Sequence, residues 1–308
     1  FATGLGQARH MDDVAERGGI PQFPGVARFE LAADIAAGQA HAILGQCDRA
    51  IATLQRVLRH RSEIAPVQLP VVCGALSFAL ALRGEVAAAK AQAEQALQLA
   101  ADAGLVNHHV RTVPARLGLA TVAAITGDLD TALATLQDAA ERCRPLRAAN
   151  LLAACGQIAA LCGVSHSYLA DVEPPLTAAA VPIVEQLTIA VAARDRSRLG
   201  DHAGAERLLR STAPHEVMLG TWVEILLHRT ERRTLRRWLA RLDKPSSRHA
   251  QIVRLLAEAA VAESASEASR RTAAAAELAS EGHLIGVLMN APAQLWRSFD
   301  AEHSPHPM

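Results

Sequence analysis

The feature of this sequence that most constrains its fold is a short glycine motif that recurs at a nearly regular interval. In each copy a Gly is followed at once by a polar or acidic residue and, five positions after the Gly, by an Ala. The copies begin at Gly45, Gly84, Gly127 and Gly200, which are 39, 43 and 73 residues apart. Gly163 divides the last interval almost in half. Repeats of this length indicate helix pairs that stack into an elongated array.

The motif has the chemistry of a turn between two helices. Glycine readily adopts the left-handed conformation that ends many helices, so the first helix of each pair should end there. The next residue, which is acidic in Glu85, Asp128 and Asp201, should cap the second helix and meet its positive end. The small Ala should let the second helix lie close to the first. Apolar residues such as Leu133 and Leu136 follow at helical spacing, which supports this assignment.

The composition favours closely packed helices over strands. Of the 308 residues 50% are hydrophobic but only 3% are aromatic, so the core must consist mainly of Ala, Leu and Val. Ala and Leu are good helix formers, whereas strands are enriched in β-branched and aromatic residues. We therefore predict an all-α fold: a right-handed superhelix (solenoid) of about seven tetratricopeptide-like helix pairs with a C-terminal capping helix.

The net charge and the cysteines exclude several classes of protein. The 31 basic residues balance 31 acidic ones, which gives no indication of a surface for nucleic acid or membrane. No stretch approaches the ~20 consecutive apolar residues that cross a bilayer. The five cysteines show no CxxC spacing, which fits the reduced thiols of a cytoplasmic protein better than a disulfide framework.

Helix boundaries follow from the same pattern. The first helices are expected at 26–44, 67–83, 108–126, 147–162, 180–199, 215–229 and 247–262. The second helices are expected at 47–61, 85–103, 128–144, 201–212, 231–242 and 266–280. Pro174 and Pro175 should interrupt the second helix of the fourth pair within 165–176, and 283–300 should form the capping helix. Residues 1–25 are expected to be a lead-in segment, 26–302 the repeat domain and 303–308 a frayed tail.

No catalytic or cofactor-binding pattern stands out. The sequence contains no GxxxxGK[ST] phosphate loop, no GxGxxG after a strand, no HExxH and no GxSxG. His108 and His109 are adjacent, but neighbouring residues of a helix point ~100° apart, so the two rings cannot easily share one ion. We therefore predict that the protein is not an enzyme and holds no metal or cofactor.

The candidate binding residues come from the register of the glycine motif. In tetratricopeptide repeats the concave face is lined by first-helix positions at fixed distances before the Gly. The position six before the Gly holds Gln39, Phe78, Thr121, Gln157 and Arg194, and the position thirteen before holds Ala32, Val71, Pro114, Asn150 and Leu187. Our candidate ligand-binding residues are Gln39, Phe78, Arg111, Thr121, Arg147, Asn150, Gln157, Arg194 and Trp222.

These candidates allow two interpretations. Their side chains, with Arg111 and Arg147 near the rim, either are solvated on an open face or form a pocket for a polar, hydroxyl-rich or anionic ligand. The second is the usual form of a small-molecule site, which is mostly apolar with a few placed polar groups. Trp222 is either a core residue or an aromatic wall for the ligand, whereas Trp238 and Trp296 are expected in the core.

The C-terminal third of the sequence resembles a known family. The segment Leu278–Pro292, with its pairs Glu281-Gly282 and Ala291-Pro292, resembles the final repeat of MalT-like regulators, the large ATP-binding members of the LuxR-type transcription regulators. Leu187–Leu209 is similar to the family's penultimate repeats. In that family an ATPase domain precedes the repeats and a helix-turn-helix domain follows them. The resemblance implies that this chain is the sensor segment of such a regulator.

The resemblance further implies an inducer-sensing function. Sugars such as malto-oligosaccharides are the family's best-known inducers, and they favour an ATP-dependent, oligomerising active state. We expect a small polar ligand here, a sugar or disaccharide, on the concave face, with Phe78 and Trp222 as candidates for stacking on a sugar ring.

The alternative is an adaptor that binds a peptide or a partner helix in the same groove. In either case we expect this fragment to contact neither nucleic acid nor membrane, since the DNA-binding domain is expected downstream. The full-length regulator is expected to be cytoplasmic and to oligomerise.

Overall fold

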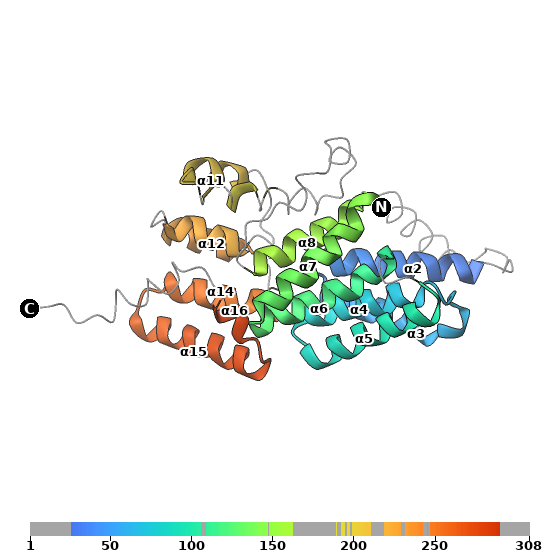
Figure 1. The fold of residues 1–308 in the computed structure, drawn as a ribbon. Helices are drawn as coiled ribbons and strands as arrows, with labels where there is room; N and C mark the ends of the chain where they lie inside the picture. Colours follow the sequence, from blue (N-terminus) through green and yellow to red (C-terminus); the bar gives the residue numbers. More distant parts are fainter. Residues whose placement is uncertain are drawn as a thin grey trace, which may run out of the picture.

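The fold is described from a computed structural model of the 308-residue chain. The structure describes residues 26–289 apart from 106–108, 147, 163–188, 190–191, 195, 198, 211–218, 229–231, 243–244 and 246. Within these residues the regular structure is entirely helical (Figure 1). The α-helices are α2 (Val26–Ile43), α3 (Cys47–Arg59), α4 (Leu69–Arg83), α5 (Val86–Asp102), α6 (Val113–Thr126), α7 (Leu129–Cys143), α8 (Ala149–Leu161), α11 (His202–Arg210), α12 (Leu219–His228), α13 (Arg232–Arg241), α14 (Arg248–Ala260), α15 (Ala265–Glu281) and α16 (Ile285–Met289). Short 3-10 helices are η1 (Arg61–Glu63), η2 (Val110–Thr112) and η3 (Arg144–Leu146).

Each recurring glycine has the left-handed conformation that the motif predicts. The angle φ is 69° at Gly45, 95° at Gly84, 94° at Gly127 and 88° at Gly200. After Gly84, the backbone N–H of Glu85 donates to a carbonyl five residues earlier at 2.9 Å, and the same bond with the same length follows the other three glycines. This bond closes the end of a helix, so the predicted turn between two helices is confirmed.

The residue after the glycine caps the second helix at two of these corners. Carboxylate oxygens of Asp128 and Asp201 accept backbone N–H groups three residues further on, at 3.2 and 2.8 Å. Gln46 and Glu85 make no such bond, and Glu85 pairs with Arg83 instead. Asp is among the best capping residues because its short side chain reaches the first turn. The predicted capping is therefore confirmed for the aspartates and wrong for the longer side chains.

The alanine of each motif is fully buried. Ala50, Ala89, Ala132 and Ala205 are each 0% exposed. In the second pair, the hydroxyl of Ser77 on α4 also donates to the carbonyl oxygen of Ala89 on α5 at 2.7 Å. All four alanines are therefore buried as the motif predicts, and at Ala89 the hydrogen bond from Ser77 shows the two helices of the pair in direct contact.

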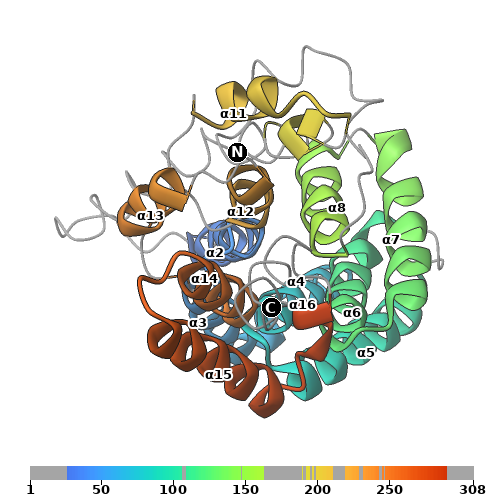
Figure 2. The ribbon, with the colours of Figure 1, turned by 90° about the vertical axis from the view of Figure 1, so that its left-hand side faces the viewer.

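The helices lie in two layers around a ring (Figure 2). The second helices α5, α7, α13 and α15 lie outside, and the first helices α4, α6, α8, α12 and α14 lie inside. Neighbouring inner helices pack side by side: α2 on α4, α4 on α6, and α6 on α8. The described part of the chain is therefore an all-α, curved stack of helix pairs.

Two large clusters of buried apolar side chains stabilise this stack, beside a small one between α4, α5 and α6. One extends from α2 to α8 and includes Leu54 and Phe78. The other extends over α11 to α16 and includes Trp238 and Leu256, so the predicted core position of Trp238 is confirmed. Among the described helices, none combines the length and the apolar character needed to cross a bilayer.

The C-terminal helices return to the N-terminal pairs. Helix α16 contacts α6 and α14 contacts α4, and Figure 2 shows α16 between α14 and α6. Gly286 of α16 lies against the turn at Gly127. A Cβ atom on Gly286 would be 2.4 Å from the carbonyl oxygen of Ala124 and equally close to the backbone nitrogen of Gly127. We call the packing of α14 and α16 on α4 and α6 the closing contact. It requires a glycine at position 286.

Most predicted helix boundaries lie close to the observed ones, and the largest difference within the described residues is at the helix expected from residue 108. Of the capping helix expected at 283–300, the described part is α16 (Ile285–Met289). The helix expected from residue 67 begins at Leu69, and the helix expected from residue 108 begins at Val113; each has a proline in its first turn. Proline favours that position because the N–H it lacks would have no partner there. Several predicted features lie outside the described residues: the lead-in 1–25, the break at 165–176, most of 180–199, Trp296 and the tail 303–308.

His249 of α14 lies in the closing contact. The ring is buried, and its Nδ1 is 3.4 Å from the carbonyl oxygen of Leu82 on α4. Burial favours the uncharged imidazole and lowers the pKa of His249 from 6.5 to about 4. The closing contact therefore carries a group that resists protonation.

We expect the protein to lose stability as the pH falls from about 6.5 to about 4. Above this window His249 is neutral in the folded and unfolded chains. Within it the unfolded chain takes up a proton that the folded chain excludes, so the free energy of unfolding falls by about 1.4 kcal/mol per pH unit. Urea titrations at a series of pH values measure this slope. In His249→Gln this part of the slope should vanish, and an unchanged slope would show that His249 titrates normally.

Candidate ligand-binding site

A cavity of about 200 Å³ opens among the inner helices of the N-terminal pairs. Its walls come from α2, α4, α6 and α8, together with η2. The lining residues are Gln39, Ala42, Ile43, Val71, Ala75, Phe78, Val110, Arg111, Pro114, Leu117, Ala148 and Leu151. Because these residues come from four helix pairs, the cavity exists only when the pairs are stacked.

The register of the glycine motif identifies part of this wall. Gln39 and Phe78, each six residues before the glycine of its repeat, line the cavity. Val71 and Pro114, each thirteen residues before the glycine, line it as well. Arg111, predicted near the rim, is a fifth lining residue. The structure thus brings together three of the candidate ligand-binding residues: Gln39, Phe78 and Arg111.

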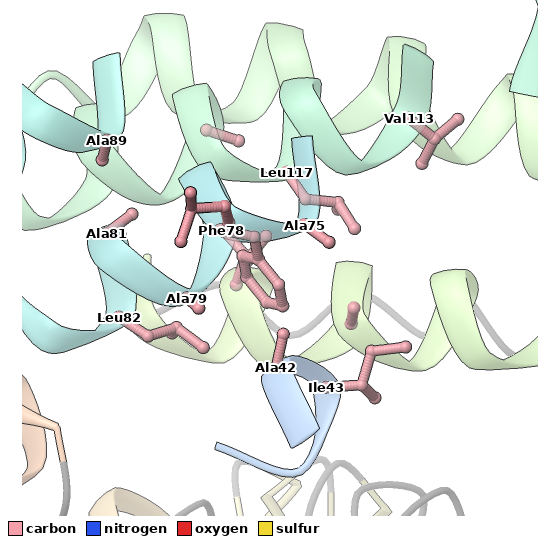
Figure 3. Close-up of a cluster of buried hydrophobic side chains, with 14 of the residues drawn as sticks. Ala42, Ile43, Ala75, Phe78, Ala79, Ala81, Leu82, Ala89, Val113 and Leu117 are labelled. Carbon is pink, nitrogen blue, oxygen red and sulfur yellow. The ribbon is translucent and has the colours of Figure 1, made fainter. Parts of the chain in front are cut away.

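Phe78 belongs to both the cavity wall and the core. Its side chain is 2% exposed, and its ring projects from α4 towards Ala42 on α2, with Ile43 beside it (Figure 3). Little of the ring is left to stack on a sugar. Phe78 therefore serves mainly as an apolar wall of the cavity.

Two polar side chains, Gln39 and Arg111, line the cavity, and both are half-buried. The backbone at Arg111 is fixed by His109, whose Nδ1 accepts the Arg111 N–H at 3.1 Å. The hydroxyl of Thr112 also donates to the carbonyl oxygen of His109 at 2.8 Å. Within the described residues, neither the Arg111 guanidinium nor the Gln39 amide has a hydrogen-bond or ion-pair partner. Both groups are therefore available to a ligand.

Two further candidates lie in the core and not in the cavity. The hydroxyl of Thr121 is buried and donates to the carbonyl oxygen of Leu117 at 2.7 Å, within α6. Trp222 is 4% exposed, and its ring centroid is 5.6 Å from that of Trp238. Of the two interpretations of Trp222, the structure supports the core residue, because the ring is buried and packs against Trp238.

Of the remaining candidates, the described one, Arg194, does not line the cavity. The Nε of Arg194 is 3.2 Å from Oε2 of Glu224 on α12, so the guanidinium is engaged in an ion pair away from the cavity. Arg147 and the side chains of Asn150 and Gln157 lie outside the described residues. The described residue of α8 that lines the cavity is Leu151.

Most of the apolar lining residues were not among the predicted binding residues, although the sequence of α4 indicates that this helix is covered by its neighbours. Between Leu69 and Leu82 every residue except Val71 is buried, and a helix that is hydrophobic all round is covered on all sides. The inner face around Val71 is therefore walled by neighbouring helices and forms a cavity that is partly open to solvent.

The described residues contain no arrangement suited to metal binding or to thiol chemistry. No group of three or more His, Cys, Asp or Glu side chains among them could hold a metal ion. All five cysteines are buried and none forms a disulfide. Burial raises the pKa of Cys143 to about 12 and that of Cys162 to about 11, and it raises the pKa of Cys73 and Cys155 as well. Because the thiolate is the nucleophile, these protonated thiols are unreactive.

A second hollow, of about 410 Å³, lies between α13, α14 and α15. Its arginines are already paired with carboxylates. Arg236 is 2.6 Å from Glu263, and both Arg254 and Arg271 are 2.9 Å from Glu258. A ligand here would have to compete with these ion pairs, so the cavity at Arg111 is the better candidate.

Comparison with known proteins assigns no family: no family model matches the sequence, and no curated protein matches it.

Proposed function

We propose that this chain is the effector-binding domain of a MalT-like transcription regulator, and that it binds a small molecule in the cavity between α2, α4, α6 and α8. In this proposal the helix pairs belong to a right-handed superhelix of about seven tetratricopeptide-like pairs with a C-terminal capping helix, in a cytoplasmic protein. The observation that carries the proposal is the cavity: it has an apolar wall and two polar side chains, Gln39 and Arg111, that have no partner among the described residues. A mostly apolar pocket with a few placed polar groups is the usual form of a small-molecule site.

A ligand in this cavity would connect helices that are distant in the sequence. Ile43 of α2, Leu117 of α6 and Leu151 of α8 all line it, and α2 also contacts α8 directly. A ligand that binds more tightly when these helices are close stabilises that arrangement by its difference in affinity between the two states. Such a shift is what a sensor domain needs to pass a signal to flanking domains.

The ligand class that the resemblance implies, a sugar or disaccharide, is the first to test. Every hydroxyl group that enters the cavity needs a hydrogen-bond partner, because burying an unpaired hydroxyl is costly. Gln39 and Arg111 are the polar side chains of the lining. They limit how many hydroxyl groups this site can satisfy.

The experiment is a thermal-shift and calorimetric screen of the chain against sugars, carboxylic acids and peptides. A ligand at 100 times its dissociation constant stabilises the folded state by about 2.7 kcal/mol, and each kcal/mol raises Tm by roughly 2–4 °C in a chain of this size. A small molecule that does so supports the proposal. If only a peptide or a partner protein binds, the adaptor alternative replaces it.

The substitution Val71→Phe is expected to abolish small-molecule binding and to leave the fold intact. Val71 lines the cavity and is only half-buried, so the larger ring can occupy the empty space. Cavity-filling substitutions commonly raise stability by about 0.5–2 kcal/mol. The matched control is Val253→Phe, at a half-buried position of α14 outside the cavity, which should bind like the unaltered chain. Calorimetry of both variants decides: full affinity in Val71→Phe would place the ligand elsewhere.

A further inference from the structure

The lining of the cavity favours one chemical class of ligand, and this inference rests on the proposed function. We propose that the ligand is an anionic amphiphile, a compact apolar body that carries a single carboxylate. Arg111 and Gln39 bind the carboxylate, and the apolar body fills the space beside Phe78.

The size of the cavity limits the ligand to about one ring. Its volume is about 200 Å³, whereas an apolar cavity of ~150 Å³ holds a benzene molecule. The difference leaves room for a short substituent on a ring, or for a medium-length alkyl chain with a small polar group. Two linked sugar rings would extend beyond it.

The walls favour an apolar body. Apolar side chains from α2, α4, α6 and α8 line the cavity: Ile43, Val71, Phe78, Leu117 and Leu151. Hydroxyl groups placed against these side chains would lose their bonds to water without replacement. A hydrocarbon chain or ring loses nothing comparable and gains from leaving water.

The charge of the lining favours a single carboxylate. Among the described lining residues, Arg111 is the one cation and none is Asp or Glu, so no described side chain of the lining neutralises the guanidinium or repels an anion. A guanidinium binds a carboxylate through two parallel N–H···O hydrogen bonds, and the Gln39 amide adds further donors. One guanidinium matches one negative charge, which favours a carboxylate over a doubly charged phosphate monoester.

The test is isothermal titration calorimetry of the whole chain with octanoate and phenylacetate, beside 1-octanol and maltose. Ligands of roughly ten non-hydrogen atoms bind with dissociation constants on the order of 0.1–1 mM, so the titrations need millimolar ligand. We expect one or both carboxylates to bind, and 1-octanol to bind at least about tenfold more weakly than octanoate, because it lacks the charged acceptor.

The variant Arg111→Gln separates charge recognition from packing. It should weaken carboxylate binding at least about tenfold, leave the affinity for 1-octanol unchanged, and keep the melting temperature, because the guanidinium has no partner within the described residues. The matched control Arg59→Gln removes an exposed arginine at the end of α3 and should change neither affinity.

The outcomes separate this inference from the proposed function. Equal affinity for octanoate and 1-octanol, or undiminished carboxylate binding by Arg111→Gln, would overturn the carboxylate proposal. Binding of maltose without either carboxylate would also overturn it while the proposed sensor function stands. If no small molecule binds in this test or in the wider screen, both proposals fail.

Discussion

Replacing Phe78 by alanine is expected to lower the free energy of unfolding by about 3–5 kcal/mol. The ring is 2% exposed and lies between α4 and α2, where Ala42 and Ile43 surround it (Figure 3). Its removal would leave space that side chains from three helices can only partly fill. Unfavourable cavity formation would therefore add to the loss of apolar burial.

Urea denaturation followed by circular dichroism measures this loss. The control Phe78→Leu keeps most of the apolar volume and should cost less than about 1.5 kcal/mol. A loss below about 1 kcal/mol in Phe78→Ala would contradict the packing of the inner helices around this residue.

The substitution Gly286→Ala is expected to detach α16 from α6. The new Cβ would be 2.4 Å from the carbonyl oxygen of Ala124, and 2.4 and 2.8 Å from the backbone nitrogen and Cα of Gly127. These are backbone atoms of a helix and its turn, which cannot rotate away as a side chain can. Overpacking of this kind costs about 1–3 kcal/mol, and the least costly response is for the short helix to move.

Small-angle scattering and limited proteolysis detect this detachment. In Gly286→Ala the radius of gyration should increase, and the C-terminal helices should be cleaved faster. Gly220→Ala makes the same chemical change in α12 with no atom within 4 Å of the new Cβ, so it should be neutral or stabilising by up to about 1 kcal/mol. Identical behaviour of the two variants would mean that the closing contact does not form.

The helix pairs could be predicted because the signals that define them are local. A left-handed glycine, the hydrogen bond after it and the buried alanine all lie within a few residues of one another. At Gly84 and Gly127 these features agree with the expected turn in every respect but one, the missing cap at Glu85. Local agreement of this kind does not depend on how the pairs curve.

The cavity could be predicted only in part, because the register places a residue on a face but does not say what covers that face. Gln39, Phe78 and Thr121 hold the same position in successive repeats. The first two line the cavity, whereas Thr121 is buried with its hydroxyl bonded inside α6. Helix α6 packs against α8 and α16 as well as α4, so equivalent positions have different neighbours.

The closing contact has no counterpart in the sequence pattern. His249 and Leu82 are 167 residues apart, several repeats from each other, and nothing in the repeat pattern pairs one with the other. Gly286 has an ordinary helical environment in the sequence, and the need for glycine there arises only from the turn at Gly127 that it meets. Contacts of this kind follow from the curvature of the whole stack.

Methyl NMR of the chain, recorded during titration with the ligand found in the screen, shows whether that ligand binds in the cavity between α2, α4, α6 and α8. The account predicts the largest shift changes at Ile43, Leu117 and Leu151, which line the cavity. The methyl groups of Ile225 and Leu256, in the other core cluster, should stay in place. Large changes at Ile225 and Leu256 with none at Ile43 and Leu117 would contradict the account.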